Sequence, residues 1–353
     1  MSSLSNYTTI YSLSDIPVLQ NVVYDTKEEA INCKTGTLNL IQCHDTGLIY
    51  NAAFNPTLIE YNQNYQNEQA ASHFFQEHLH QVSNIIINLI GSEKLIEIGC
   101  GKGYFLELMQ KYKADIIGFD PAYEGSNPNV RKCFFEHDSA NKGNGIILRH
   151  VLEHIQDPVS FLHKIRDSNK NSGKIYIEVP CFDWICKNKT WFDIYYEHVN
   201  YFRLSDFYRI FDHIIESGHL FGGQYIYVVA DINSLKEEIT PPCELINFPI
   251  DFLGGLHKLD KGSKTSVVWG GSSKGVIFAL LNSRLSNKID FAIDINPAKQ
   301  GKYLPKTGLK VLSPVDALSI LSKGDCIYIV NSNYSAEIKK FSNDFQYIEV
   351  TNE

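Results

Sequence analysis

The sequence has no long apolar run and no block of basic residues. No segment approaches the roughly 20 apolar residues that a membrane-spanning helix needs, and the first residues lack the basic flank and apolar run of an export signal. The formal net charge is −8, without a cluster of Lys and Arg that would bind a phosphate backbone. We therefore expect a cytoplasmic protein that binds neither membranes nor nucleic acid.

Paired cysteines are also missing. The eight cysteines are widely spaced, and none forms a CxxC pair. In a chain without an export signal, this spacing indicates reduced thiols rather than a disulfide framework. Hydrophobic residues make up 44 % and charged residues 20 % of the 353 residues, which excludes a disordered chain and favours two or three compact units.

Three regions follow one another along the chain. Residues 1–80 mix short β-like runs with Asn- and Gln-rich connections and end in a helical pattern. Residues 81–235 alternate apolar runs with helical patterns, which predicts an α/β fold with a doubly wound parallel sheet, and a late pair of runs predicts an edge hairpin. Residues 236–353 repeat the strand-glycine-helix pattern and predict a second, smaller Rossmann-like α/β domain.

The first glycine-rich segment, "EIGCGKG", lies between a predicted strand and a predicted helix. It contains Glu97, Gly99, Gly101 and Gly103, and Asp120 ends the next predicted strand. Glycines permit a tight turn and let a ligand approach the backbone, while the helix N-terminus adds a positive dipole end. A carboxylate at the position of Asp120 can accept both ribose hydroxyls of a nucleoside.

The spacing of these glycines is GxGxG, so the dinucleotide fingerprint GxGxxG is not met. With an acidic residue two places earlier, the segment resembles the S-adenosylmethionine (SAM) site of class I methyltransferases. The resemblance implies that Asp138 holds the adenine amino group. The alternative is that the glycines form only a tight βα turn.

Two ionisable segments follow later strands of the same predicted sheet. "RHVLEHIQDP" follows the fourth candidate strand, and its His154 either faces the site or caps a helical turn. "IYYEHVNYF", at residues 194–202, follows the fifth candidate strand and sets Glu197 and His198 among four aromatic residues. Because ligands bind at the carboxyl ends of such strands, this stretch is expected to cover the methyl donor.

Taken together, the chain resembles the sugar C-methyltransferases of NDP-deoxyhexose pathways. Three elements carry the resemblance: "EHVNYF", "GGSSKG", and "DINPAKQGKYLP" followed by "NSNYSAEI". The resemblance implies a class I SAM domain followed by a C-terminal Rossmann-like domain. It also implies that His198 is the general base, with Tyr195 and Glu197 beside it, His154 across the site and Tyr65 as the N-terminal active-site tyrosine.

The chemistry of carbon methylation suits these side chains. A proton next to a ketone must be removed, and an imidazole is available as a base at neutral pH. Tyrosine hydroxyls can donate hydrogen bonds to the enolate oxygen. Glu197 either contacts His198, which would need a turn, or faces the substrate, and because adjacent residues on a strand point apart the second is favoured. The alternative for this stretch is an aromatic core strand with one satisfied histidine.

The second glycine-rich segment, "VVWGGSSKG", again joins a predicted strand to a helix. Its amides, hydroxyls and ammonium suit phosphate, and the family resemblance implies that this domain binds the nucleotide diphosphate of the substrate through Ser273, Lys274, Asn333 and Tyr334. Asp294 ends the next strand, so an NAD site is one alternative. A domain that only packs against the rest is another.

The N-terminal segment departs from the family, which usually begins with a zinc module built on paired cysteines. Only Cys33 and Cys43 lie near the expected places, His44 is a possible third ligand, and a fourth is missing. We therefore predict a degenerate module without metal.

The sequence thus predicts a SAM-dependent C-methyltransferase that acts on a nucleotide-linked keto-sugar, as a monomer or homodimer. Two alternatives stay open. One is O- or N-methylation of another small molecule, and the other is a non-catalytic protein that binds SAM or a nucleotide.

Overall fold

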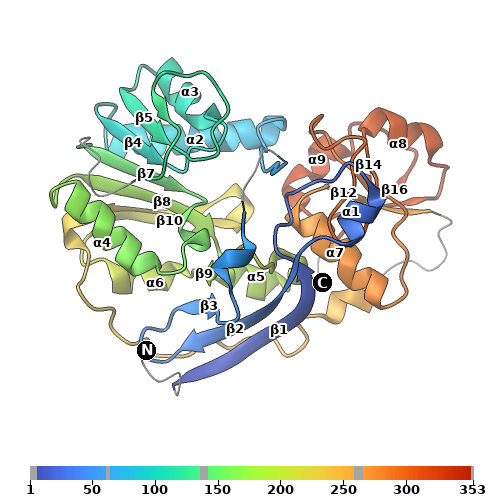
Figure 1. Cartoon of the computed structure of the whole chain (residues 1–353), viewed down its shortest axis with the longest axis horizontal. Coiled ribbons are helices and arrows are strands. Elements are labelled where there is room, and N and C mark those ends of the chain that lie inside the picture. Colours follow the sequence, from blue (N-terminus) through green and yellow to red (C-terminus); the bar gives the residue numbers. More distant parts are fainter. Residues whose placement is uncertain (1–5, 61–63, 136–141, 258–264, 351–353) are drawn as a thin grey trace.

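The computed structural model describes residues 6–60, 64–135, 142–257 and 265–350, and its strands form three sheets. The large sheet and the C-terminal sheet lie side by side, and the N-terminal sheet lies below them in the view of Figure 1. Within these ranges, no helix is long and apolar enough to cross a membrane.

The N-terminal sheet has the order β1-β2-β3-β9 and is antiparallel: β1 (Tyr7–Pro17), β2 (Thr35–Cys43), β3 (Ile49–Asn51) and β9 (Asn200–Tyr201). The large sheet has the order β10-β11-β8-β7-β4-β5-β6: β4 (Leu95–Ile98), β5 (Ile116–Phe119), β6 (Val130–Arg131), β7 (Gly145–Arg149), β8 (Lys174–Pro180), β10 (Ile214–Leu220) and β11 (Tyr225–Asp231). The C-terminal sheet has the order β14-β13-β12-β15-β16 and is parallel: β12 (Ser266–Trp269), β13 (Ala292–Ile293), β14 (Val311–Leu312), β15 (Cys326–Ile329) and β16 (Gln346–Glu349).

The α-helices are α1 (Lys27–Ile31), α2 (His73–Leu89), α3 (Tyr104–Lys111), α4 (Pro158–Ser168), α5 (Phe182–Asn188), α6 (Leu204–Ile210), α7 (Ser273–Arg284), α8 (Pro314–Ile320) and α9 (Ser335–Ile338). Short 3-10 segments are η1 (Pro56–Leu58), η2 (Leu152–His154), η3 (Trp191–Asp193), η4 (Phe221–Gly223), η5 (Ile232–Ser234), η6 (Gly254–His257) and η7 (Ser332–Tyr334).

The large sheet is covered on both faces, as the apolar runs predict. Its strands β4 to β8 are parallel, and β11 and β10 add an antiparallel hairpin at one edge. Along β7, Ile146 and Leu148 join the core under α4 and α6, whereas Ile147 joins the core under α2 and α3. Because successive side chains of a strand point to opposite faces, one apolar strand supplies both cores. The predicted α/β fold and its edge hairpin are confirmed.

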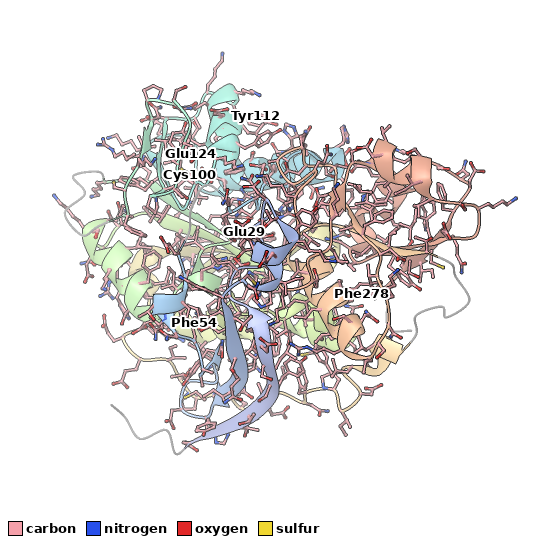
Figure 2. The ribbon with its side chains drawn as sticks, turned by 45° about the vertical axis from the view of Figure 1, so that its right-hand side comes forward. Glu29, Phe54, Cys100, Tyr112, Glu124 and Phe278 are labelled. Atoms are coloured by element: carbon pink, nitrogen blue, oxygen red, sulfur yellow. The ribbon has the colours of Figure 1, made fainter. Side chains whose placement is uncertain are left out.

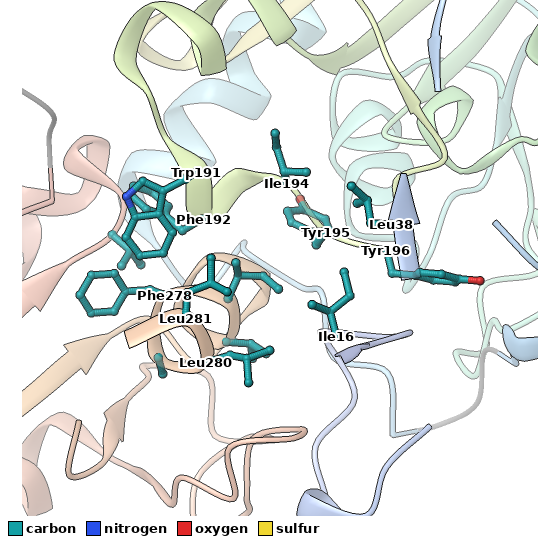
Figure 3. Close-up of a cluster of buried hydrophobic side chains, with 14 of the residues drawn as sticks. Ile16, Leu38, Trp191, Phe192, Ile194, Tyr195, Tyr196, Phe278, Leu280 and Leu281 are labelled. Atoms are coloured by element: carbon teal, nitrogen blue, oxygen red, sulfur yellow. The ribbon is translucent and has the colours of Figure 1, made fainter. Parts of the chain in front are cut away.

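An aromatic wedge after β8 joins the three sheets. Trp191 on η3 stacks on Phe278 of α7, with ring centroids 5.6 Å apart, while Tyr196 reaches Gly36 of the N-terminal sheet. Figure 3 shows the wedge between α7 and the strand residues Ile16 and Leu38. Almost every side chain along α7 is buried, which is typical of a helix packed on all sides.

The N-terminal segment also contacts the C-terminal domain. Helix α1, which carries Glu29 in Figure 2, lies against residues 303–308: the Lys306 amide donates to the Ala30 carbonyl, and Tyr24 bridges to Tyr303. The division of the chain near residues 80 and 235 stays a prediction, and α2 continues across residue 80.

Candidate active site

The first glycine-rich loop lies between β4 and α3 at the centre of the large sheet, where the strand order reverses between the neighbouring strands β4 and β7. Gly99, Gly101 and Gly103 all have positive φ, between 55° and 82°. At Gly99 a Cβ atom would also lie 2.4 Å from Val151 Cγ2, so no other residue fits there without a shift. The loop includes Cys100, which Figure 2 labels.

Two carboxylates flank this loop and line a cavity of about 820 Å³. Asp120, just after β5, accepts the Gly101 amide at 2.8 Å and the Ala122 amide at 2.8 Å. Glu97 on β4 is buried, and its Oε2 has no hydrogen-bond partner. Burial raises the pKa of Glu97 to about 7, against the opposing effect of Arg149. Asp138 lies outside the described residues.

His198, the predicted base, is buried among rings at the middle of the same cavity. Its ring centroid lies 4.2 Å from that of Tyr195 and 4.9 Å from that of His154. Burial, followed by the charges of His154, His150 and Lys274, holds the pKa of His198 well below its usual range. The imidazole is therefore neutral at neutral pH.

Tyr195 and His154 are each held through the backbone. The Tyr201 hydroxyl accepts the Tyr195 amide and donates to the Tyr195 carbonyl, both at 3.0 Å, and burial raises the pKa of Tyr195 well above its usual value. His154 Nδ1 lies 2.9 Å from the Glu197 carbonyl oxygen, which can only accept a proton. Nδ1 therefore carries a hydrogen.

Glu197 does not face the substrate cavity, contrary to our expectation from its position beside His198. Its Oε2 accepts the Tyr65 hydroxyl at 2.6 Å, and its Oε1 accepts the Gln20 amide at 3.2 Å. The turn around residues 195–198 directs its carboxylate toward the N-terminal segment, where burial raises its pKa. Tyr65 itself lines the cavity, so Glu197 reaches the site through Tyr65.

A buried charge cluster beneath these residues was not predicted. Glu178 on β8 is fully buried, and its Oε1 lies 3.1 to 3.5 Å from His78 Nε2, Arg149 Nη2 and His150 Nε2. Burial opposes the charged form, but these three groups together hold the pKa of Glu178 well below its usual range. His78 comes from α2, about 70 residues before the adjacent Arg149 and His150, so sequence spacing carries no signal of the cluster.

His150 links this cluster to Glu153. Its backbone φ is 52°, and its Nδ1 lies 3.2 Å from Glu153 Oε1. Burial disfavours the charged imidazole, yet the bonds to Glu153 and Glu178 outweigh it and raise the pKa of His150 to about 9. The second oxygen of Glu153, Oε2, is buried without a hydrogen-bond partner, and the residue lines the cavity.

The C-terminal domain closes the opposite side of the cavity with its own glycine-rich loop, between β12 and α7. Asp294, after β13, accepts the Gly271 amide at 2.8 Å, which repeats the contact between Asp120 and Gly101. Lys299, which sequence reasoning missed, is 2 % exposed; its Nζ lies 2.5 Å from Ser272 Oγ and 3.6 Å from Asp294 Oδ2.

The structure changes the expectations for the predicted phosphate ligands. Lys274 lines the cavity, but its ammonium is 2.8 Å from Asp193 Oδ2 and donates to Gln224 at 2.8 Å, so its charge is already compensated. Asn333 does not line the cavity, because its side chain donates to the Phe221 carbonyl at 2.7 Å. The preceding turn places Asn331 there instead. Ser273 and Tyr334 do line the cavity.

The N-terminal cysteines lie at the two ends of one strand. Cys33 precedes β2 and Cys43 ends it, so about ten extended residues, on the order of 30 Å, separate them. His44 beside Cys43 contacts Thr8 Oγ1 and Asn6 Oδ1 through its two ring nitrogens, both at 2.8 Å. One tetrahedral ion cannot reach both cysteines.

Comparisons with known proteins agree with this geometry. A family model of a methyltransferase domain matches residues 64–214, and a model of a C-methyltransferase C-terminal domain matches residues 244–349. The chain is 22 % identical over 318 residues to C-methyltransferase NovU of Streptomyces niveus, covering 77 % of this chain and 74 % of that protein. It is also 28 % identical over 109 residues to a tRNA U34 carboxymethyltransferase of Campylobacter hominis, covering 26 % and 37 %.

Two solved structures are similar in part. The PH0226 protein of Pyrococcus horikoshii OT3 is 10 % identical, with 49 % of this chain and 99 % of that chain covered and a TM-score of 0.38. The plantazolicin methyltransferase BpumL, solved in complex with SAH, is 16 % identical, with 48 % and 88 % covered and a TM-score of 0.36.

The large sheet, its glycine loop and the match to a methyltransferase domain define a SAM-dependent methyltransferase. Within this class, the second matching model and the similarity to NovU support a C-methyltransferase. The methyltransferase class, the class I fold and the SAM cofactor predicted from sequence are thereby confirmed, and the predicted resemblance is supported at the level of C-methyltransferases.

Proposed function

We propose that the protein methylates carbon next to the ketone of a nucleotide-linked sugar. The observation that carries the proposal is a buried, neutral His198, flanked by Tyr195 and His154, in one cavity that also reaches both glycine loops. Such a cavity has room at the upper end of the range of about 300–1,000 Å³ that is usual for ligand pockets. SAM at the first loop and the sugar substrate at the second loop would then meet beside His198.

His198 would take the proton from the carbon next to the ketone. The electron pair of the broken C–H bond moves toward the ketone oxygen and gives an enolate, and the imidazole becomes an imidazolium. Tyr195 would donate its hydroxyl proton in a hydrogen bond to the enolate oxygen, since burial keeps that hydroxyl protonated. Tyr65, held by Glu197, borders the same space.

The residues of the first loop fit SAM. The unpartnered Oε2 of Glu97 suits a cationic ligand, and Asp120 can accept ribose hydroxyls. Because Val151 leaves no room for a side chain at position 99, the residue there is glycine, and its bare backbone can be approached by the ligand. When bound, SAM supplies the methyl group for the new C–C bond. The surrounding apolar and aromatic walls would keep water from the enolate.

The second loop would bind the nucleotide part of the substrate. Helix α7 begins at Ser273, so its first amides and its dipole favour a diphosphate, and the buried Lys299, whose Nζ lies 3.6 Å from Asp294 Oδ2, adds a hydrogen-bond donor. Asp294 would accept ribose hydroxyls from the nucleoside. In this arrangement Lys299 takes the role that sequence reasoning gave to Lys274.

The experiment is a screen of keto-sugar nucleotides for release of S-adenosylhomocysteine, with the product identified by mass spectrometry and NMR. Matched sugars that carry a hydroxyl in place of the ketone serve as controls. Carbon methylation of a keto-sugar alone supports the proposal. Methylation of oxygen or nitrogen in the control sugars, or SAM binding without turnover of any substrate, contradicts it. Titration with NAD separately tests the nucleotide assignment of the second loop.

The same screen with a Lys299→Met variant tests the second loop. We expect a KM for the nucleotide sugar at least about tenfold higher, with SAM affinity unchanged, because one charged hydrogen bond is worth about 1.5–3 kcal/mol. An unchanged KM would remove Lys299 from the nucleotide site.

A further inference from the structure

Three potential metal ligands that line the cavity lie close together. Glu153 and His154 lie on η2, after β7, and His198 lies in the turn after the aromatic wedge. Each offers one ligand atom, and these atoms all lie within 4.8 Å of one another. Among the residues that the structure describes, no other group of three or more His, Cys, Asp or Glu side chains has its ligand atoms this close together.

Neighbouring groups orient two of the three ligands. His154 gives its Nδ1 hydrogen to the Glu197 carbonyl at 2.9 Å, which aims Nε2 away from that bond. Glu153 receives His150 at its Oε1, and His150 is itself anchored by Glu178. Hydrogen bonds of this kind to the outer atoms of metal ligands are the usual support of a metal site.

The unpartnered oxygen of Glu153 is an independent sign of a ligand. Glu153 is 1 % exposed, and its Oε2 has no hydrogen-bond partner although the residue borders the cavity. An unpaired buried carboxylate oxygen carries a large desolvation cost, so a cation beside it is strongly favoured. His198 and His154 add two imidazoles at the same point.

We propose that Glu153, His154 and His198 bind a divalent transition-metal ion of the Zn²⁺, Co²⁺ or Ni²⁺ class. Imidazole nitrogens and a carboxylate oxygen are the donors such ions prefer, whereas Mg²⁺ and Ca²⁺ prefer oxygen ligands. Bonds of about 2.0–2.2 Å require the three atoms, which lie within 4.8 Å of one another, to draw closer when the ion binds. The cavity leaves the fourth position open to water or substrate.

The site has a consequence that rests on the proposed function. A lone pair of His198 that binds a metal ion cannot accept a proton from carbon. Metal binding and carbon deprotonation would therefore exclude each other, and the ion would act as a reversible inhibitor of the enzyme. Metal affinity itself does not depend on the identity of the sugar.

The test uses the full-length protein, stripped with a chelator and titrated with Co²⁺ alone and with Zn²⁺ alone. We expect one Co²⁺ per chain with the visible absorption bands of nitrogen-and-oxygen coordination, and calorimetric binding of one Zn²⁺. Glu153→Gln and His154→Gln should each weaken Zn²⁺ binding at least about tenfold. Circular dichroism and SAM binding check that these variants are folded.

Two control variants remove other potential ligands. The double variant Cys33→Ser, Cys43→Ser and the variant His73→Ala, whose side chain is 79 % exposed, should bind Zn²⁺ as the wild type does. No binding by the wild type, or binding that the triad variants retain, would overturn the proposal. Loss of binding in the cysteine variant would assign the ion to the N-terminal segment instead.

A second measurement separates this inference from the proposed function. With a substrate whose α-proton exchanges, one equivalent of Zn²⁺ should suppress exchange and a chelator should restore it. Full exchange in the presence of bound Zn²⁺ would contradict mutual exclusion. If no keto-sugar exchanges at all while the triad binds Zn²⁺, the proposed function fails and the metal site stands.

Discussion

Glu97 provides a quantitative test of the SAM site. Its carboxyl is buried with one unpartnered oxygen, and its pKa is about 7, so it is largely protonated at pH 6 and largely ionised at pH 8. A cationic ligand such as SAM binds the ionised form better. If only that form binds, the apparent Kd rises by a factor of 1 + 10^(pKa − pH), so SAM should bind about tenfold more tightly at pH 8 than at pH 6.

The assay is isothermal titration of SAM into the wild type and into Glu97→Gln at both pH values. The Gln variant keeps the size of the side chain and carries every other pH effect, including ionisation of the ligand's own amino group. The difference between the two pH dependences isolates Glu97. We expect the gain in SAM affinity from pH 6 to pH 8 to be about tenfold larger in the wild type than in Glu97→Gln. An equal pH dependence of the Kd in the two proteins would refute the role of Glu97.

Three further substitutions test the architecture. Asp120→Ala should raise the Kd of SAM about 10- to 100-fold by titration, since charged hydrogen bonds are worth about 1.5–3 kcal/mol; an unchanged Kd would exclude Asp120 from the ribose site. Lys274→Met should cost about 3 kcal/mol in urea unfolding by leaving Asp193 buried and unpaired, and adding Asp193→Asn should recover most of it; no recovery would exclude the ion pair as the cause. Trp191→Ala, which removes the stack on Phe278, should cost about 3–5 kcal/mol, and a loss below 1 kcal/mol would contradict the wedge.

The fold was predictable because its signals are local. An apolar strand, three glycines and a helix follow one another directly around Gly101, and the alternation of such units predicts the parallel sheet. The carboxylate of Asp120 was predictable for the same reason, since the ends of parallel strands meet at one edge. The structure places both at the cavity.

The ion-pair partners of the buried charged residues were not predictable, because they are brought together by packing between segments far apart in the sequence. Lys274 pairs with Asp193, 81 positions earlier, and Glu178 gathers His78 from α2 and Arg149 from β7. No spacing in the sequence encodes these contacts. Lys299 stood in a segment that the resemblance had already singled out, yet its burial became visible only in the folded chain.

Glu197 shows how an adjacency argument succeeds in part and then fails. Sequence reasoning left contact with His198 open but favoured a carboxylate that points away from it, and in the structure Glu197 contacts Tyr65 and Gln20. It did not foresee that the N-terminal segment supplies Gln20 and Tyr65 as partners, which takes the carboxylate away from the cavity. A segment without regular periodicity thus completes the site.

Solvent exchange at the substrate carbon tests the central claim most directly. A keto-sugar nucleotide that the enzyme methylates is incubated in deuterated water without SAM, and loss of the α-proton signal is followed by NMR. We predict exchange with the wild type and its loss with His198→Ala, while that variant still binds SAM. Exchange at the wild-type rate in His198→Ala would contradict the account, as would turnover by a wild type that never exchanges this proton.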